Sequence, residues 1–204
     1  MECSVTEQQR VYIRRVARND ETEFTRLMRD SQHLHDPWIS PPTNAVLFRH
    51  YLQRISREDH EGFVICRKQD DRIVGAININ HIVRGSFLSA SLGYYVGAEF
   101  QGHGYMAEGL KLLTNYAFTT LGLHRLEANI QPDNKRSQQL VRRCGFKKEG
   151  YSEAFLFING AWPVSYTHLT LPTTCNLCRS RWSPYHYKKS VGGGGGGGGV
   201  GGGG

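Results

Sequence analysis

The stretch Tyr94–Glu108, YYVGAEFQGHGYMAE, connects a predicted buried strand to a predicted helix through a glycine turn. The strand ends at Gly97, and Gly102 and Gly104 come just before the start of the helix. Small residues there let backbone N–H groups point outward, and the positive end of the helix dipole also attracts anions. The turn is therefore a candidate site for a phosphate or pyrophosphate. Its spacing matches neither the dinucleotide-binding fingerprint nor the P-loop, and a glycine turn that only starts a helix fits equally well.

Hydrophobic patterning on both sides of this turn predicts strands interspersed with helices. A first helix opens at Asp20, and Thr43 is expected to cap a second one, with Val46 and Leu47 in its apolar stripe. An Asn159-Gly160 hairpin turn follows the last strand. The order predicts an α/β (α+β) fold with a mixed, partly antiparallel central sheet flanked by helices. The remaining expected elements are strands at residues 10–16, 62–67, 72–82, 87–96, 124–131 and 146–158, and helices at 105–120 and 133–143.

The overall charge of +7 and the 24 glycines are unevenly placed along the 204 residues. Residues 1–163 hold 21 basic and 18 acidic side chains, so their net charge of +3 gives little reason to expect a nucleic-acid partner. No apolar run approaches the roughly 18 residues of a membrane span, and no signal peptide is expected. Scattered cysteines at positions 3, 66 and 144 suit reduced thiols. We therefore expect a cytoplasmic protein with no membrane association.

The composition of residues 164–204 differs from that of the rest of the chain. We therefore predict a domain over residues 1–163 and a tail over 164–204 that is disordered or artefactual. Cys175 and Cys178 are compatible with a zinc knuckle or a redox pair, and the polyglycine with a flexible linker. A third interpretation is translated adapter and homopolymer read-through, because GGG encodes glycine. In that case the natural last strand is missing, and Val164, Tyr166 and His168 imitate it as far as Pro172.

Several segments between residues 10 and 162 are similar to the Gcn5-related N-acetyltransferase (GNAT) superfamily, and within it to the ribosomal-protein-alanine N-acetyltransferases. Met106 departs from the Gly or Ala that is general in the superfamily, but it is usual in that subfamily. The segments that carry the resemblance are Trp38 after Pro37, Val83–Phe87, Leu92–Tyr94, Gln101–Met106, His124-Arg125, Asn134–Ser137, Cys144–Tyr151 and Asn159–Trp162.

This resemblance implies acetyl-coenzyme A as the acyl donor and no metal. Its pyrophosphate would lie on the backbone amides of the glycine turn, and its pantetheine arm would pair with the strand end where two neighbouring strands splay apart. The residues expected to bind it are Tyr95, Val96, Gln101, Gly102, His103, Gly104, Tyr105, Met106, Ala107 and Asn134.

For catalysis, the resemblance assigns Asn134 to the pantetheine or carbonyl region and Ser137 to protonation of the departing thiolate. Residues such as Asn134 also commonly cap a helix without any catalytic role. A backbone N–H near Val96 is the expected oxyanion donor. Glu127 is the leading carboxylate for the general base. Further candidates for the base are Glu153 and His81, and candidates for peptide contacts are Arg84 and Trp38.

The resemblance implies a protein N-terminus as acceptor, with a ribosomal protein bearing an N-terminal alanine as the leading target, and a monomer or weak dimer. Because one fold serves many acceptors, acetylation of a small amine such as a polyamine, antibiotic or amino acid stays open. A non-catalytic acyl-coenzyme A sensor is a third alternative.

Overall fold

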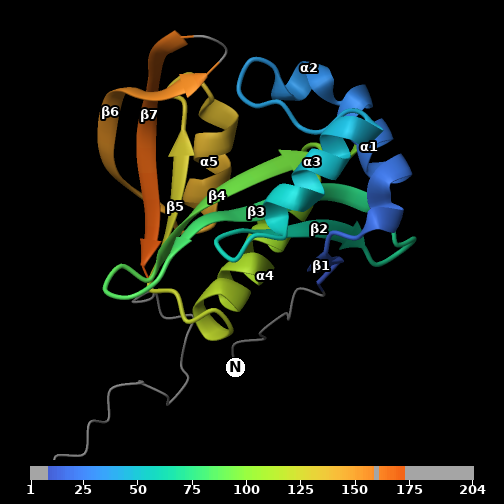
Figure 1. Ribbon diagram of the computed structural model, residues 1–204, viewed down its shortest axis with the longest axis horizontal. Helices are drawn as coiled ribbons and strands as arrows, with labels where there is room; N and C mark the ends of the chain where they lie inside the picture. The colour runs from blue at the N-terminus through green and yellow to red at the C-terminus, as the bar shows by residue number, and fades with distance from the viewer. Residues whose placement is uncertain (1–8, 159–160, 173–204) are drawn as a thin grey trace, which may run out of the picture.

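The computed structural model describes residues 9–158 and 161–172. Its centre is a seven-stranded sheet in the order β1-β2-β3-β4-β5-β7-β6 (Figure 1). Neighbouring strands are antiparallel, except that β4 and β5 run parallel. The strands are β1 (Val11–Arg15), β2 (Glu61–Arg67), β3 (Ile73–Val83), β4 (Ser89–Val96), β5 (Arg125–Ile130), β6 (Lys147–Ile158) and β7 (Ala161–Pro172).

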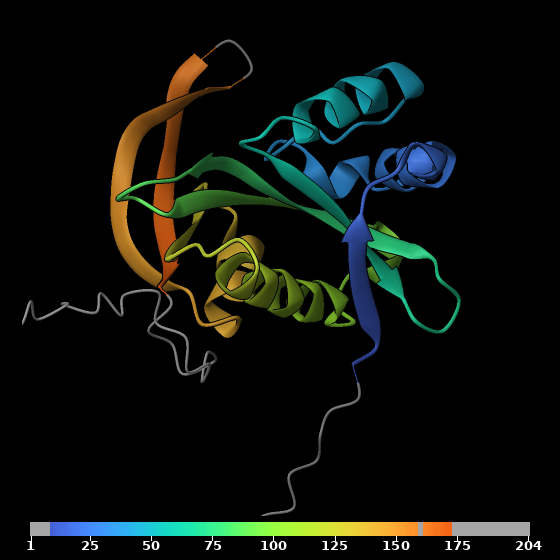
Figure 2. The same cartoon turned by 60° about the horizontal axis from the view of Figure 1, so that its bottom comes forward.

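Helices cover both faces of the sheet, as the mixed-sheet prediction required (Figure 2). One face carries α1 (Glu21–Asp30), α2 (Gln32–His35) and α3 (Ala45–Ile55). The other carries α4 (Tyr105–Thr119) and α5 (Lys135–Arg143), and two short 3-10 turns are η1 (Arg18–Asp20) and η2 (Ala98–Phe100). Fully buried side chains from both layers form the core: Phe24, Met28, Phe48, Ile65, Ile73, Ile77, Ile79, Leu110, Leu113, Leu123, Leu126 and Leu169.

The expected cap and apolar stripe of α3 are both wrong in detail. Asn44, not Thr43, caps the helix, because its side-chain oxygen accepts a hydrogen bond from the Leu47 N–H at 2.9 Å. Val46 and Leu47 are 52% and 44% exposed, and Phe48 faces the core instead. The helix therefore begins one residue later than predicted, and the predicted stripe is wrong at Val46 and Leu47, whereas its later member Tyr51 is buried as expected.

Beyond residue 163 the chain remains part of the sheet, because β7 continues to Pro172 and lies between β5 and β6. Leu169 and Leu171 of this strand are buried in the core. The first nine residues of the predicted tail thus form sheet structure in this chain. The cysteine pair, the polyglycine and the Asn159-Gly160 turn lie outside the described residues, and the non-biological origin of 164–204 stays a prediction.

Asp20 forms a structural ion pair at the entrance to α1. Its carboxylate accepts two hydrogen bonds from the Arg14 guanidinium, at 2.7 and 2.8 Å, and one from the Ala17 N–H at 2.8 Å. Burial alone would raise the pKa of Asp20, but the bonds from Arg14 and Ala17 outweigh it and hold the pKa below its usual value. A depressed carboxyl pKa adds stability above the unfolded pKa of about 3.9, which is lost as pH falls through the folded value.

We therefore expect Asp20→Asn to destabilise the fold by about 1–3 kcal/mol at pH 7, because it weakens charged hydrogen bonds. The difference from the parent chain should narrow as pH falls through the lowered pKa of Asp20, because Asp20 itself is then protonated. Urea unfolding at a series of pH values measures the free energy of unfolding of the variant and of the parent chain. If the difference in the free energy of unfolding between the two chains stays constant down to pH 2, the stabilising role of the Asp20 charge is contradicted.

Within the described residues, no helix is long and apolar enough to cross a membrane. The same residues contain no cluster of three or more His, Cys, Asp or Glu side chains arranged to hold a metal ion.

Candidate active site

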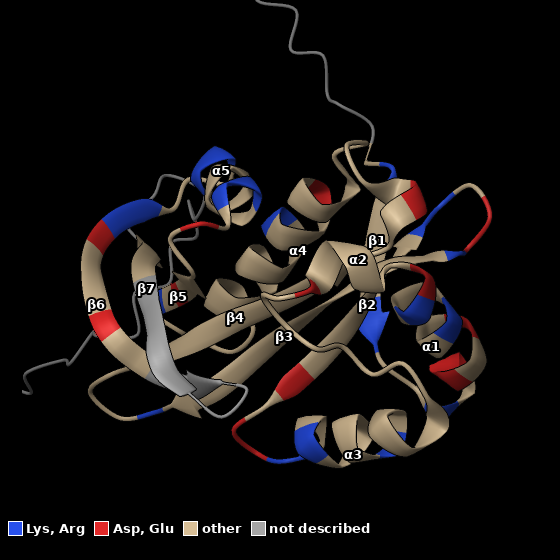
Figure 3. Ribbon diagram, turned by 90° about the horizontal axis from the view of Figure 1, so that it is seen from above, with Lys and Arg blue, Asp and Glu red and all other residues tan. Residues whose placement is uncertain are grey.

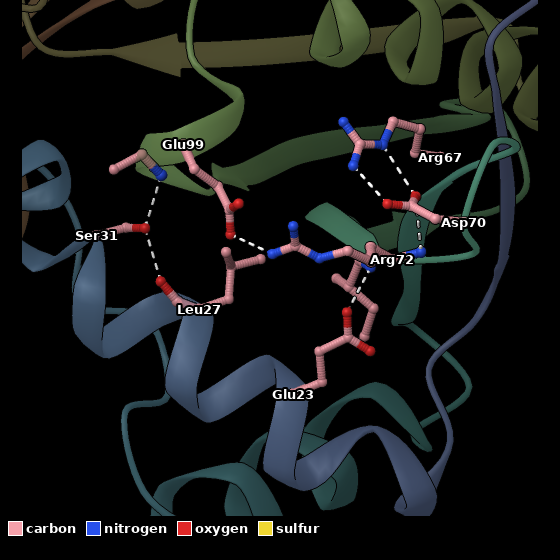
Figure 4. Close-up of polar contacts among 9 residues, drawn as sticks. Glu23, Leu27, Ser31, Arg67, Asp70, Arg72 and Glu99 are labelled. Carbon is pink, nitrogen blue, oxygen red and sulfur yellow. Dashed lines mark hydrogen bonds and ion pairs between the residues drawn. The ribbon is translucent and has the colours of Figure 1, made fainter.

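The site begins where β4 ends and the chain turns into α4. The Ala98 N–H donates to the Ser31 hydroxyl at 2.7 Å, and that hydroxyl donates to the Leu27 carbonyl at 2.6 Å. Glu99 forms an ion pair with Arg72 (Figure 4). These contacts fix η2, the segment before the glycine turn, against α1 and the β2–β3 hairpin.

Gly102 and Gly104 both adopt a φ of +83°, which side-chain-bearing residues rarely adopt. Gly104 is the N-cap of α4, with no side-chain hydrogen bond to the first helical N–H groups. A Cβ placed on Gly102 would meet no atom within 4 Å, so this backbone faces open space. The glycine turn and the helix start therefore lie where the sequence predicted them, and the first N–H groups of α4 have no side-chain cap.

Arg10 contacts the glycine turn and stabilises it. Its guanidinium donates to the His103 carbonyl at 2.8 Å, forms an ion pair with Glu108 and lies 4.8 Å from the centre of the Tyr105 ring. The His103 and Tyr105 rings stack at 5.7 Å. Neither ring lines the cleft described below, so any role of these two residues in binding would be through the backbone.

The parallel strands β4 and β5 separate along their length. Their pairing runs from Ser89↔Arg125 to Ser91↔Glu127 and stops there, although β4 continues to Val96. The Gly97 N–H donates to Val74 on β3, so strand alternation directs the N–H and C=O of Val96 toward the gap. The splayed strands implied by the family resemblance are therefore present, with Val96 at the open end.

His35 occupies one side of that open end, and nothing in its local sequence pattern predicted it. Its Nε2 lies 3.0 Å from the Val96 carbonyl, which fixes this nitrogen as the donor. Burial lowers the pKa of His35, so the ring is neutral at pH 7. The contact fixes α2 against the end of β4.

Asn134 and Ser137 form the opposite side, at the start of α5. The Asn134 side-chain oxygen accepts a hydrogen bond from the Ser137 N–H at 3.1 Å, so Asn134 is the helix N-cap. Tyr94 of β4 donates to the Ser137 carbonyl at 3.4 Å, and burial raises the pKa of Tyr94 to about 12. The Ser137 hydroxyl has no hydrogen-bond partner among the described residues. Asn134 thus does cap the helix, and it also lines the cleft.

These walls enclose a cleft of about 680 Å³. Tyr95 is outside it, buried on the α3 side of the sheet. Of the residues predicted to bind the cofactor or to catalyse transfer, the cleft lining contains Val96, Gln101, Gly102, Gly104, Met106, Ala107, Asn134 and Ser137.

Basic side chains also line the cleft. Lys135, Arg136 and Arg143 belong to α5, whose positive charge is visible in Figure 3. Cations in the first turn of a helix oppose its dipole, so the positions of Lys135 and Arg136 are unfavourable for the helix itself. That unfavourable placement was a usable sequence signal for an anionic ligand.

The predicted general bases lie away from the cleft lining. Glu127 forms an ion pair with Arg125 at 2.8 Å, and Arg125 also contacts Glu149. Glu153 is exposed on β6. The Arg84 guanidinium donates to the Leu121 carbonyl at 2.9 Å, whereas Trp38, the other candidate for a peptide contact, does line the cleft.

Residues 10–147 match the family model described as acetyltransferase (GNAT) domain. The chain belongs to this family. The solved structure of Mycobacterium smegmatis RimJ in complex with CoA-disulfide superposes on this chain with a TM-score of 0.73. That match covers 80% of this chain and 82% of the other, at 25% sequence identity.

Curated relatives include proteins named for two acceptors. The [ribosomal protein uS5]-alanine N-acetyltransferase of Escherichia coli strain K12 is 42% identical over 100 residues, which is 49% of this chain and 52% of the relative. The spermidine N(1)-acetyltransferase of the same strain is 29% identical over 128 residues, or 61% and 67% of the two chains. The chain spans less than two thirds of the length of the first curated relatives that it matches.

Proposed function

We propose that the chain transfers an acetyl group from acetyl-coenzyme A to the α-amine of a protein N-terminus, with a ribosomal protein N-terminal alanine as the leading acceptor. One observation carries the proposal: the gap between β4 and β5 meets the start of α4 in a cleft that also contains Asn134 and Ser137. The 42% identity to an enzyme named for ribosomal alanine supports this acceptor. A ribosomal acceptor would place the activity in the cytoplasm.

The residues of the cleft fit coenzyme A. Its phosphates would lie on the N–H groups of the glycine turn, where a Cβ at Gly102 would project into open space. Lys135, Arg136 and Arg143 would neutralise the same phosphates. When bound, acetyl-coenzyme A supplies an activated acetyl thioester.

Groups of the chain itself would stabilise the oxyanion and protonate the leaving group. The Val96 N–H, directed into the gap, stabilises the oxyanion, and one such donor is typically worth about 3–4 kcal/mol. The Ser137 hydroxyl, which has no partner among the described residues, donates a proton to the departing sulfur. An α-amine has a pKa of about 7.7–8.0, so a useful fraction is neutral at physiological pH and a modest base is sufficient.

Coenzyme A release measured with an alanine-initiated peptide, with spermidine and without acceptor separates the candidate functions. Turnover of the peptide alone supports the proposal. Turnover of spermidine alone favours the polyamine function, which the 29% identical relative suggests. Binding of acetyl-coenzyme A without turnover of either amine points to a sensor.

Ser137→Ala is expected to lower kcat about tenfold, because the thiolate loses its proton donor. The Kd for acetyl-coenzyme A should change by less than about twofold, since the hydroxyl acts only as the bond to sulfur breaks. Ser137→Thr keeps the hydroxyl and is the matched control, expected to retain most of the activity. An alanine variant with the parent kcat would remove Ser137 from the mechanism.

A further inference from the structure

The glycine turn has an inner side that faces the cleft and an outer side that does not. Gly102 and Gly104 line the cleft, whereas His103 between them does not. Arg10 and Glu108 also lie outside the cleft lining, and Arg10 contacts both His103 and Glu108. The turn is therefore held on its outer side by side chains that do not themselves face the cleft.

Arg10, just before β1, joins the turn to the helix that follows it. Its guanidinium donates to the His103 carbonyl at 2.8 Å. Its Nε donates to the Glu108 carboxylate at 2.8 Å, and its backbone N–H donates to the other oxygen of that carboxylate at 2.9 Å. Because Glu108 belongs to the first turn of α4, a single arginine fixes the glycine turn relative to the helix start.

The bond from Arg10 determines the direction of the Gly104 N–H. The peptide bond between His103 and Gly104 is trans, and in a trans peptide the carbonyl and the N–H point to opposite sides. Since the His103 carbonyl points to Arg10, the Gly104 N–H points the other way, toward the cleft that Gly104 lines. Within residues 9–158 and 161–172 this N–H donates to no other group.

His103 acts in the same way on the peptide before it. Its Nδ1 lies 3.0 Å from the Gln101 carbonyl oxygen, so this nitrogen is the donor. By the same geometry the Gly102 N–H points away from the His103 ring, and it too has no acceptor in the described part of the chain. The ring is held by stacking on the Tyr105 ring, with 8° between the two planes.

These outer contacts matter because glycine does not hold its own peptide planes. A residue without a Cβ populates many backbone conformations, so an unsupported turn would present its N–H groups to the cleft only part of the time. A ligand would then have to order the turn as it binds, at a cost in conformational entropy. The contacts of Arg10 and His103 order the turn beforehand.

We propose that Arg10 and His103 are positioning residues for the phosphates of coenzyme A. From the outer side of the turn they hold the Gly102 and Gly104 N–H groups toward the pyrophosphate, and Glu108 anchors Arg10. The inference rests on the proposed function, because it requires the glycine turn to bind acetyl-coenzyme A. The three side chains act through the backbone and do not contact the ligand.

The first test is Arg10→Met, which removes the side-chain donors but keeps a long side chain beside the Tyr105 ring. We expect the Kd for acetyl-coenzyme A, measured by isothermal titration calorimetry, to rise about fivefold to tenfold, as for the loss of one ordering hydrogen bond. The KM for acetyl-coenzyme A should rise with it. The kcat at saturating acetyl-coenzyme A should not change, because acetyl transfer is proposed to take place at Val96 and Ser137.

Arg15→Met is the matched control. Arg15 also belongs to the first strand region and contacts α4, through the Tyr116 hydroxyl at 3.1 Å. It forms an ion pair with Glu61 at 3.0 Å and lies 5.6 Å from the centre of the Phe63 ring. This variant should lose a similar amount of thermal stability without any change in Kd. Equal losses of affinity in the Arg15 and Arg10 variants would mean that Arg10 only stabilises the fold, and would overturn the proposal.

Glu108→Ala separates positioning from a direct contact between Arg10 and the phosphates. Removing a carboxylate near the site would strengthen anion binding if charge alone mattered, and it would release Arg10 toward the ligand. If Glu108 anchors Arg10, the Kd rises instead, by about threefold. The double variant with Arg10→Met should then bind no more weakly than Arg10→Met alone. An unchanged or lower Kd for Glu108→Ala would overturn the proposal.

His103→Phe tests the second contact. Phenylalanine keeps a ring to stack on Tyr105 but has no N–H for the Gln101 carbonyl. We expect the Kd for acetyl-coenzyme A to rise about threefold with kcat unchanged. Parent affinity in this variant would contradict the role of His103.

Calorimetry needs no acceptor, so the proposed function and this inference can fail separately. If the parent chain binds acetyl-coenzyme A but acetylates neither the peptide nor spermidine, the proposed transfer fails and the role of Arg10 is still measured. If the parent transfers the acetyl group and Arg10→Met binds as tightly as the parent, the inference alone fails. If the parent does not bind acetyl-coenzyme A, both fail together.

Discussion

Replacing Gly102 with valine is expected to lower the affinity for acetyl-coenzyme A about a hundredfold. A φ of +83° is costly for a β-branched residue, by about 1–3 kcal/mol, so the turn would shift its N–H groups. The added side chain would also project into the open space that the phosphates need. Isothermal titration calorimetry with acetyl-coenzyme A measures the loss directly.

Gly122→Val is the matched control for this experiment. Gly122 has a φ of +66°, and a Cβ at this position would likewise meet no atom within 4 Å, but it follows α4 at the end away from the cleft. Both variants should lose a similar amount of thermal stability, whereas only Gly102→Val should lose affinity. Equal affinities in the two variants would remove the glycine turn from the binding site.

A chain ending at Pro163 is expected to lose its cooperative thermal unfolding transition. The cut removes most of β7, which pairs with β5 on one side and β6 on the other and contributes Leu169 and Leu171 to the core. Losing one buried leucine typically costs about 2–5 kcal/mol, so losing two together with a central strand exceeds the stability of most domains. Circular dichroism during heating measures the transition.

A chain ending at Pro172 keeps all of β7 and is the control. It should melt within a few degrees of the full chain, because it keeps Leu169 and Leu171 in the core and the pairing of β7 with both β5 and β6. A cooperative transition in the chain ending at Pro163 would show that β7 is dispensable. It would then support a domain boundary at residue 163.

Local patterns were enough to predict the elements that line the cleft. The glycine turn, the helix after it and the cap at Asn134 each depend on a few adjacent residues, and the structure places them as expected. The face of α3 was harder to predict, because Val46, Leu47 and Phe48 are all apolar and only tertiary packing decides which of them is buried.

The surroundings of His81, one of the predicted bases, depend on contacts between distant segments. The bulge that turns His81 appears only in the register between β3 and β4, and His60 reaches it from the loop before β2. Single-sequence patterns carry no information on register at this level, so His81 was only one candidate among several. The alternation of Val164, Tyr166 and His168 did indicate a last strand ending at Pro172, but the predicted boundary at residue 163 placed most of β7 in the tail.

The gap between β4 and β5 has a consequence for the kinetics. His35 and Trp38 line the cleft from one face of the sheet, and Ser137 and Leu140 line it from the other. Donor and acceptor can therefore be held at the same time, each from its own side. For the proposed transfer we therefore expect ternary-complex kinetics, in which no covalent acetyl-enzyme forms and neither product leaves before both substrates have bound.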